Sequence, residues 1–146
     1  MFLSQRDETF GMAVWIFTGN EEDADWKAYL DALTSGSRYA QTAPERPVFV
    51  VQIVDPGSPV PSASWRRAIA GASSRVPSHV FFILVSTSLA VRSVSTALRW
   101  LRAPSYEEMA VASLEEAAEL MEQRRRGARM RVLRMERETR ASARAR

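Results

Sequence analysis

The feature that most constrains the fold is an almost unbroken apolar run at residues 47–55, Pro-Val-Phe-Val-Val-Gln-Ile-Val-Asp. This run has the length of a β-strand and is rich in β-branched residues. Such a run is typical of a strand that is covered on both faces, in the middle of a sheet between helices. A second run at residues 79–85, His-Val-Phe-Phe-Ile-Leu-Val, has the same character. The two runs therefore predict two buried strands.

Shorter signals predict the remaining elements. Strands are expected at residues 2–6 and 12–18, joined through a turn at Gly11 as a hairpin, and at residues 108–112. Apolar residues at helical spacing and capping signals predict four helices. The first carries Trp26, Tyr29, Leu30 and Leu33 and stops at Gly36; the second spans residues 62–74; the third carries Val91, Val94, Leu98 and Leu101; the fourth runs from Ser113 to Gly127.

The order of these elements predicts the architecture. Strands and helices alternate after the initial hairpin, and this alternation implies parallel strands with right-handed crossovers. We therefore expect an α/β fold: a mixed, mostly parallel sheet of about five strands with an N-terminal hairpin and four helices.

The charges divide the chain of 146 residues into two parts. Residues 1–123 carry 15 acidic and 10 basic groups, whereas residues 124–146 carry 10 arginines against Glu136 and Glu138. We expect an α/β domain at residues 1–127 and a basic, arginine-rich C-terminal extension at residues 128–146 that is dispensable for folding. Whether the extension is helical or disordered stays open.

Composition argues against several kinds of chemistry. The absence of cysteine excludes disulfides, thiolate metal sites and thiol nucleophiles. His79 is the only histidine, which argues against a His-dependent triad or a multi-histidine metal site. The sequence contains no phosphate-binding glycine loop. Asp55 is more simply interpreted as a turn residue before Pro56 and Gly57 than as a catalytic acid. We expect no enzyme, no catalytic residue, no metal and no cofactor.

The location follows from hydropathy. No apolar stretch approaches the roughly 18 residues that a membrane span needs, and the N-terminus lacks the basic start of a signal peptide. We expect a cytoplasmic protein without a membrane span.

The candidate site is the loop and helix start at residues 55–67. The carboxyl end of a central strand followed by a helix is where open α/β sheets place their sites. Three prolines stiffen the loop, and the free N–H groups of the helix start favour an anion. We expect a partner-binding surface made of Asp55, Ser58, Ser62, Ser64, Arg66 and Arg67. The simpler alternatives are a rigid connector and a serine that only caps the helix.

Three stretches of the chain carry a resemblance to a known family. The first is the hairpin with Phe17-Thr-Gly19 and Asp23-Ala-Asp-Trp26; the second is the buried strand ending at Asp55 with a serine-capped helix after it; the third is Val111-Ala-Ser-Leu-Glu-Glu-Ala-Ala118. Together these stretches resemble the STAS domain, the SpoIIAA-like fold of anti-sigma-factor antagonists and related bacterial regulators. The resemblance covers residues 2–125 and is one of topology.

The resemblance implies a small regulator without catalysis that binds another protein, such as a regulator or a kinase-like partner, or a second copy of itself. In many such domains a partner kinase phosphorylates a serine at the start of the second helix, and Ser62 and Ser64 occupy that place here. The usual Asp-Ser-x-Gly signature is missing, because the stretch reads Pro61-Ser-Ala-Ser-Trp65.

The basic extension supports an alternative function. Its arginines, together with those just before it, could bind RNA, DNA or anionic lipid through their charge. The residues concerned are Arg124, Arg125, Arg126, Arg129, Arg131 and Arg134. Of these interpretations, we favour an extension that is solvated or binds a protein partner over one that binds nucleic acid.

Overall fold

The computed structural model describes residues 1–101 and 104–146, with residues 97–101 described by their backbone alone. The strands are β1 (Phe2–Asp7), β2 (Met12–Phe17), β3 (Val48–Val54), β4 (Val80–Val85) and β5 (Glu107–Val111). The helices are α1 (Asp23–Thr42), α2 (Ala63–Ser73), α3 (Leu89–Leu101), α4 (Leu114–Arg124) and α5 (Ala128–Arg144).

The strands form one mixed sheet in the order β1-β2-β3-β4-β5. β1 and β2 are an antiparallel hairpin, and the remaining neighbours are parallel. The predicted α/β class, the five-stranded mixed sheet and the N-terminal hairpin are confirmed. β3 is the middle strand, as its continuous apolar sequence requires.

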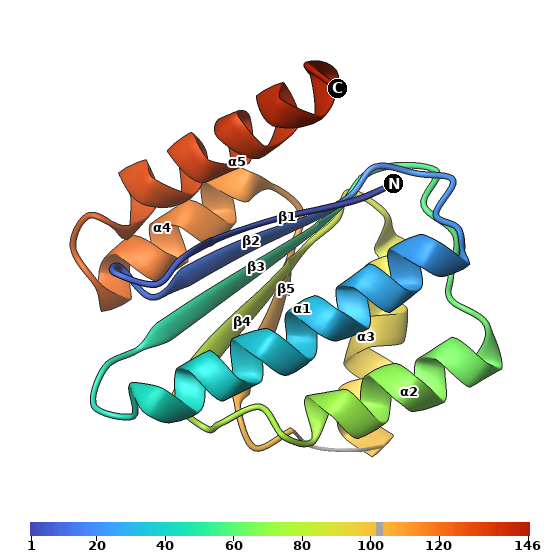
Figure 1. The fold of residues 1–146 in the computed structure, drawn as a ribbon. Helices are drawn as coiled ribbons and strands as arrows, with labels where there is room; N and C mark the ends of the chain where they lie inside the picture. Colours follow the sequence, from blue (N-terminus) through green and yellow to red (C-terminus); the bar gives the residue numbers. More distant parts are fainter. Residues whose placement is uncertain (102–103) are drawn as a thin grey trace.

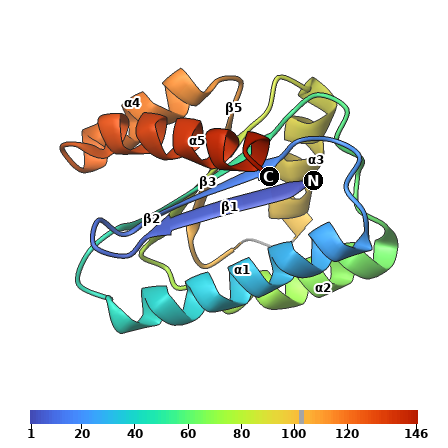
Figure 2. The same cartoon turned by 45° about the horizontal axis from the view of Figure 1, so that its top comes forward.

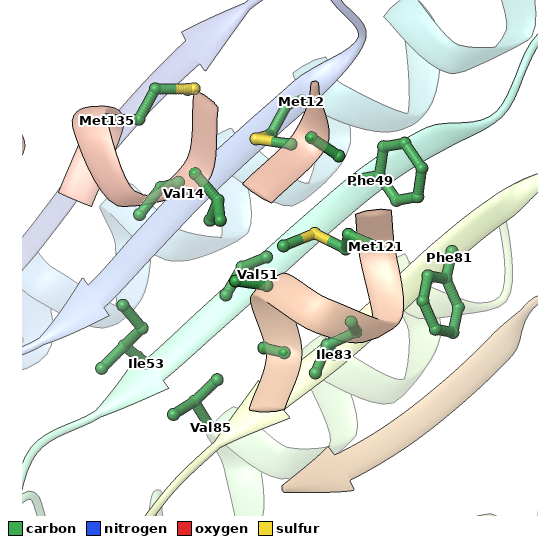
Figure 3. Packing of buried hydrophobic residues seen from close by; sticks show 14 of the residues in the cluster. Met12, Val14, Phe49, Val51, Ile53, Phe81, Ile83, Val85, Met121 and Met135 are labelled. Carbon is green, nitrogen blue, oxygen red and sulfur yellow. The ribbon is translucent and has the colours of Figure 1, made fainter. Parts of the chain in front are cut away.

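Helices cover both faces of the sheet: α1, α2 and α3 lie on one face, and α4 and α5 on the other (Figure 1). Because side chains alternate along a strand, each strand contributes side chains to the core on both faces of the sheet. Val14, Val51 and Ile83 belong to the cluster beneath α4 and α5 (Figure 3), and none of them is exposed. Their neighbours Trp15 and Phe82 belong to the second cluster, which packs against α1.

The predicted apolar stripe of α1 is confirmed at Trp26, Tyr29 and Leu33, which are buried, while Leu30 is half-buried. The predicted stop at Gly36 is wrong, because α1 continues to Thr42. Ala40, beyond the glycine, is 1% exposed in the core. Burial of this last stretch of the helix outweighs the cost of about 1 kcal/mol that a glycine adds to a helix interior.

The core face expected for α3 is only partly described. Val91 is half-buried, whereas Val94 is 43% exposed. The side chains of Leu98 and Leu101 lie outside the described residues.

The prediction of four helices is wrong, because the described residues form five. The predicted stop at Gly127 lies beyond the end of α4 at Arg124, and Gly127, with a left-handed φ of 91°, is instead the N-cap of α5. Figure 2 shows α5 lying over β1 and β2, with which it makes contacts. Ala128, Val132 and Met135 are buried in the core. The extension is therefore a structural layer, and this burial argues against the expectation that it is dispensable for folding.

We predict that Met135→Ala destabilises the fold by about 2–5 kcal/mol, because it removes a buried side chain from the sheet–α5 interface. Met130 provides the matched control, since it lies on the same helix but is 65% exposed. Met130→Ala should change the free energy of unfolding by less than about 0.5 kcal/mol. Urea unfolding of both variants measures the difference, and equal losses would show that α5 does not pack as described.

Candidate functional site

The loop that follows β3 lies at the carboxyl edge of the parallel strands, next to the loop between β2 and α1 (Figure 1). Ser58 joins the two loops: its Oγ donates to the carbonyl oxygen of Phe17 at 3.3 Å and lies 3.5 Å from Oε1 of Glu21. The same Oε1 accepts from the backbone N–H of Gly19 at 2.7 Å. Because the side chain of Glu21 is completely buried, this carboxylate fixes the base of the loop.

Asp55, the first residue of this loop, is bound by α5. Its two carboxylate oxygens accept hydrogen bonds from Nη1 and Nη2 of Arg140 at 2.7 and 2.9 Å. The Nε of Arg140 also donates to Glu136, one turn earlier, at 2.5 Å. The hydrogen bonds to Asp55, with the one to Glu136, raise the pKa of Arg140 and so keep its guanidinium charged. Asp55 therefore holds α5 against the end of β3.

The remaining predicted residues gather at the start of α2. Ser62 is the N-cap, with its Oγ accepting from the backbone N–H of Trp65 at 3.4 Å and lying 3.0 Å from Oγ of Ser64. Nη1 of Arg66 donates to the carbonyl oxygen of Pro61 at 2.7 Å. Arg67 and both serines are exposed. Four of the six predicted residues thus share one short exposed segment.

Asp55 lies apart from that segment. Along β3, Val51 and Ile53 face the cluster beneath α4 and α5, and Asp55 continues the same alternation. Its bond to Arg140 agrees with this orientation. The sequence-based set therefore combined two faces of the sheet in one surface.

Most of the arginines proposed for nucleic acid have partners within the chain. Arg124 forms a double hydrogen bond with Glu107 and lies over the ring of Phe81, and Arg125 donates to the carbonyl oxygen of Phe10. Arg129 pairs with Glu119 at 2.9 Å, and Arg131 with Asp7 at 3.0 Å. Arg126 and Arg134 are exposed. These contacts fasten α4 and α5 to the sheet and its hairpin and, through Arg129 and Glu119, to each other.

A cavity of about 540 Å³ lies beside the loop, between the sheet and helices α1, α2 and α3. Its lining includes Trp26 and Tyr29 from α1, Phe82 from β4, and Tyr106 and Glu108 from the last part of the sheet. No residue of α2 is buried, and the half-buried side chains of Ile69, Ala70 and Ser73 line the cavity. Sequence reasoning missed this cavity. The only signal was the run of small residues along α2, where alanines, serines and a glycine leave space below the helix.

Burial is the main cause that raises the pKa of Tyr106 to about 12, with the negative charge of Glu108 adding to it. Burial is also the main cause that raises the pKa of Tyr29, with Tyr106 and Glu108 adding to it, and the hydroxyl of Tyr29 donates to Oε1 of Gln52 at 2.9 Å. Both phenols are therefore hydrogen-bond donors at neutral pH, next to a carboxylate.

Within residues 1–101 and 104–146, no three His, Asp or Glu side chains come together in a group that could hold a metal ion. No helix of this described part is long and apolar enough to cross a membrane. The sequence matches no protein-family model and no curated protein.

We predict a measurable coupling between Asp55 and Arg140. A double-mutant cycle with Asp55→Ala and Arg140→Ala should give a coupling free energy of about 1 kcal/mol, because the pair is bidentate but still about a quarter exposed. The coupling should shrink as salt is added. Strictly additive losses in urea unfolding would mean that the two side chains do not stabilise each other.

Proposed function

We propose that this chain is a cytoplasmic, non-enzymatic regulatory domain of the STAS, SpoIIAA-like kind that acts by binding another protein. The binding surface is the segment of residues 58–67, named here the α2 entry segment. The observation that carries the proposal is its exposure: Val60 is 59% exposed between two prolines, and α2 buries no residue. An exposed apolar residue in a stiff loop is suited to contact with a partner, since little ordering cost remains.

The charge of the α2 entry segment defines the chemistry of its partner. Arg66 and Arg67 lie in the first turns of α2, where there is no acidic residue, and the helix N-terminus adds partial positive charge. An acidic or phosphorylated segment of the partner fits this surface. Ser62 and Ser64 are exposed at the same place, so a phosphate on either would invert its charge and act as a switch.

Two contacts support a non-enzymatic function. Nε2 of His79 lies 2.8 Å from the carbonyl oxygen of Ala40, between β4 and the end of α1. Asp55, the candidate acid, is paired with Arg140. Both residues therefore have structural partners. The five-stranded mixed sheet with its N-terminal hairpin supports the STAS-like assignment at the level of topology.

The nucleic-acid alternative has weaker support. Four of the six arginines that suggested it are held by groups of the chain itself, among them Glu107, Glu119 and Asp7. Binding through the remaining exposed arginines would fall steeply with salt, because each phosphate contact releases counterions.

We predict that Arg67→Glu weakens partner binding by about tenfold or more, since it reverses a charge in the α2 entry segment without removing a contact that holds the fold. Arg134→Glu is the matched control: it makes the same change on an exposed position of α5, on the opposite face. Quantitative affinity capture from the source cell compares the two variants with the wild type.

Ser62→Asp tests the switch in the same capture and should also reduce binding. Circular dichroism checks that each variant is folded. If Arg67→Glu and Ser62→Asp both retain the wild-type partner, the surface is wrongly placed. If nuclease treatment or Arg134→Glu removes the captured material instead, the nucleic-acid alternative replaces the proposal.

A further inference from the structure

The cavity between the sheet and helices α1, α2 and α3 has the size of a small-molecule site. Its volume of about 540 Å³ falls in the range of roughly 300–1,000 Å³ that such sites occupy. Three aromatic side chains of its lining pack against one another: the ring centroids of Phe17 and Tyr29 are 5.1 Å apart, and those of Phe17 and Trp26 are 5.2 Å apart. All three residues are buried, so this aromatic wall is held in place by packing.

Most polar side chains of the lining already have partners within the chain. Arg66 donates to the carbonyl oxygen of Pro61 on the exposed loop, and Glu108 accepts from Ser95. Four serines of the lining donate hydrogen bonds to other groups of the chain: Ser58, Ser74, Ser95 and Ser105. The cavity therefore offers a ligand mainly apolar and aromatic surface.

Gln52 is different, because it keeps hydrogen-bonding capacity on the floor of the cavity. It is the one polar residue of β3, and it lies on the same face of the strand as Val50 and Val54. Its Oε1 accepts from the hydroxyl of Tyr29 at 2.9 Å. Its amide Nε2 has no hydrogen-bond partner among the residues that the structure describes, and the residue is half-buried. An amide nitrogen carries two N–H donors, so a donor is available beneath an otherwise apolar space.

These features together select a neutral ligand with an acceptor. An ion would lose its hydration on entering an apolar cavity, whereas an apolar ring gains from leaving water. A flat ring can also stack on, or meet edge to face, the aromatic wall. An acceptor on the ligand would satisfy the amide of Gln52, which fixes the orientation of the ligand.

We propose that this cavity binds a small neutral molecule with a flat apolar ring and a carbonyl-type acceptor, the acceptor pairing with Nε2 of Gln52 and the ring packing against the aromatic wall. The proposal does not depend on the proposed protein partner, since it follows from the lining alone. Residues 58–61 line the cavity and also belong to the α2 entry segment. A bound molecule would therefore contact the inner side of that surface.

Four probes with one bicyclic body test the ligand class on the full chain by isothermal titration calorimetry. They are 1-indanone, indane, indane-1-carboxylate and 1-aminoindane, and at neutral pH the last two carry a charge. 1-Indanone should bind about fivefold more tightly than indane, because one neutral hydrogen bond contributes on that scale. Each ionic probe should bind at least about tenfold more weakly than 1-indanone. An ionic probe or indane that binds as tightly as 1-indanone, or no binding by any of the four, would overturn the ligand class.

A change at Gln52 tests the role of its amide. Gln52→Met removes the donors and nearly keeps the length of the side chain, so it should lower the affinity for 1-indanone about fivefold and leave that for indane nearly unchanged. Gln41→Met is the matched control, since it makes the same change at an exposed position of α1 outside the described lining. Equal effects of the two variants on 1-indanone would show that Gln52 does not bind the acceptor.

A second pair of variants tests the place of binding and serves even if Gln52→Met does not fold. Ala70→Leu fills the cavity from α2 and should abolish the binding of 1-indanone. Ala68→Leu adds the same side chain at an exposed position of the same helix and should bind 1-indanone like the wild type. Undiminished binding by Ala70→Leu, or equal losses in both leucine variants, would show that this cavity is not the site.

Discussion

Burial of β3 and β4 on both faces is the constraint on which the rest of the structure depends. Ile83 and Val51 point to one side and Phe82 and Val50 to the other, and all four are at most 8% exposed. Strands of this composition need two separate helical layers, because either face left in water would lose the apolar burial that drives folding. Helices α1, α2 and α3 cover one face of the sheet, and helices α4 and α5 cover the other (Figure 1).

The two layers are unequal, and the difference explains where function can reside. α4 and α5 lie close to the sheet, with Met121 and Met135 buried against it (Figure 3). On the opposite face α1 packs tightly, whereas α2 contributes small side chains and leaves the aromatic cavity beneath it. A tightly packed layer and a loosely filled one therefore share the same sheet, and the proposed partner-binding segment lies on the loosely filled side.

Elements with a local sequence pattern could be predicted, whereas features that depend on contacts between distant residues could not. Residues 48–54 and 80–85 were predicted almost to the residue because a continuous apolar run is a local pattern. α5 was not predicted as a core helix because Val132 and Met135 stand among arginines, and only the contact with the sheet shows which side of the helix is buried. For the site, Ser62 as N-cap was foreseen from local sequence. The pairing of Asp55 with Arg140 joins positions 85 residues apart, and the cavity depends on how three helices meet, so neither has a local signature.

The position of α5 has a consequence for the order in which the protein can assemble during synthesis. β1 and β2 are made before β3, β4 and β5, yet the helix that covers them is made after every strand. Until α5 emerges, the apolar side of the hairpin has no partner, and a nascent chain in that state offers a binding surface to chaperones or to other unfinished chains. Arg140, which fastens α5 to the end of β3, can therefore bind Asp55 only after every strand has been made.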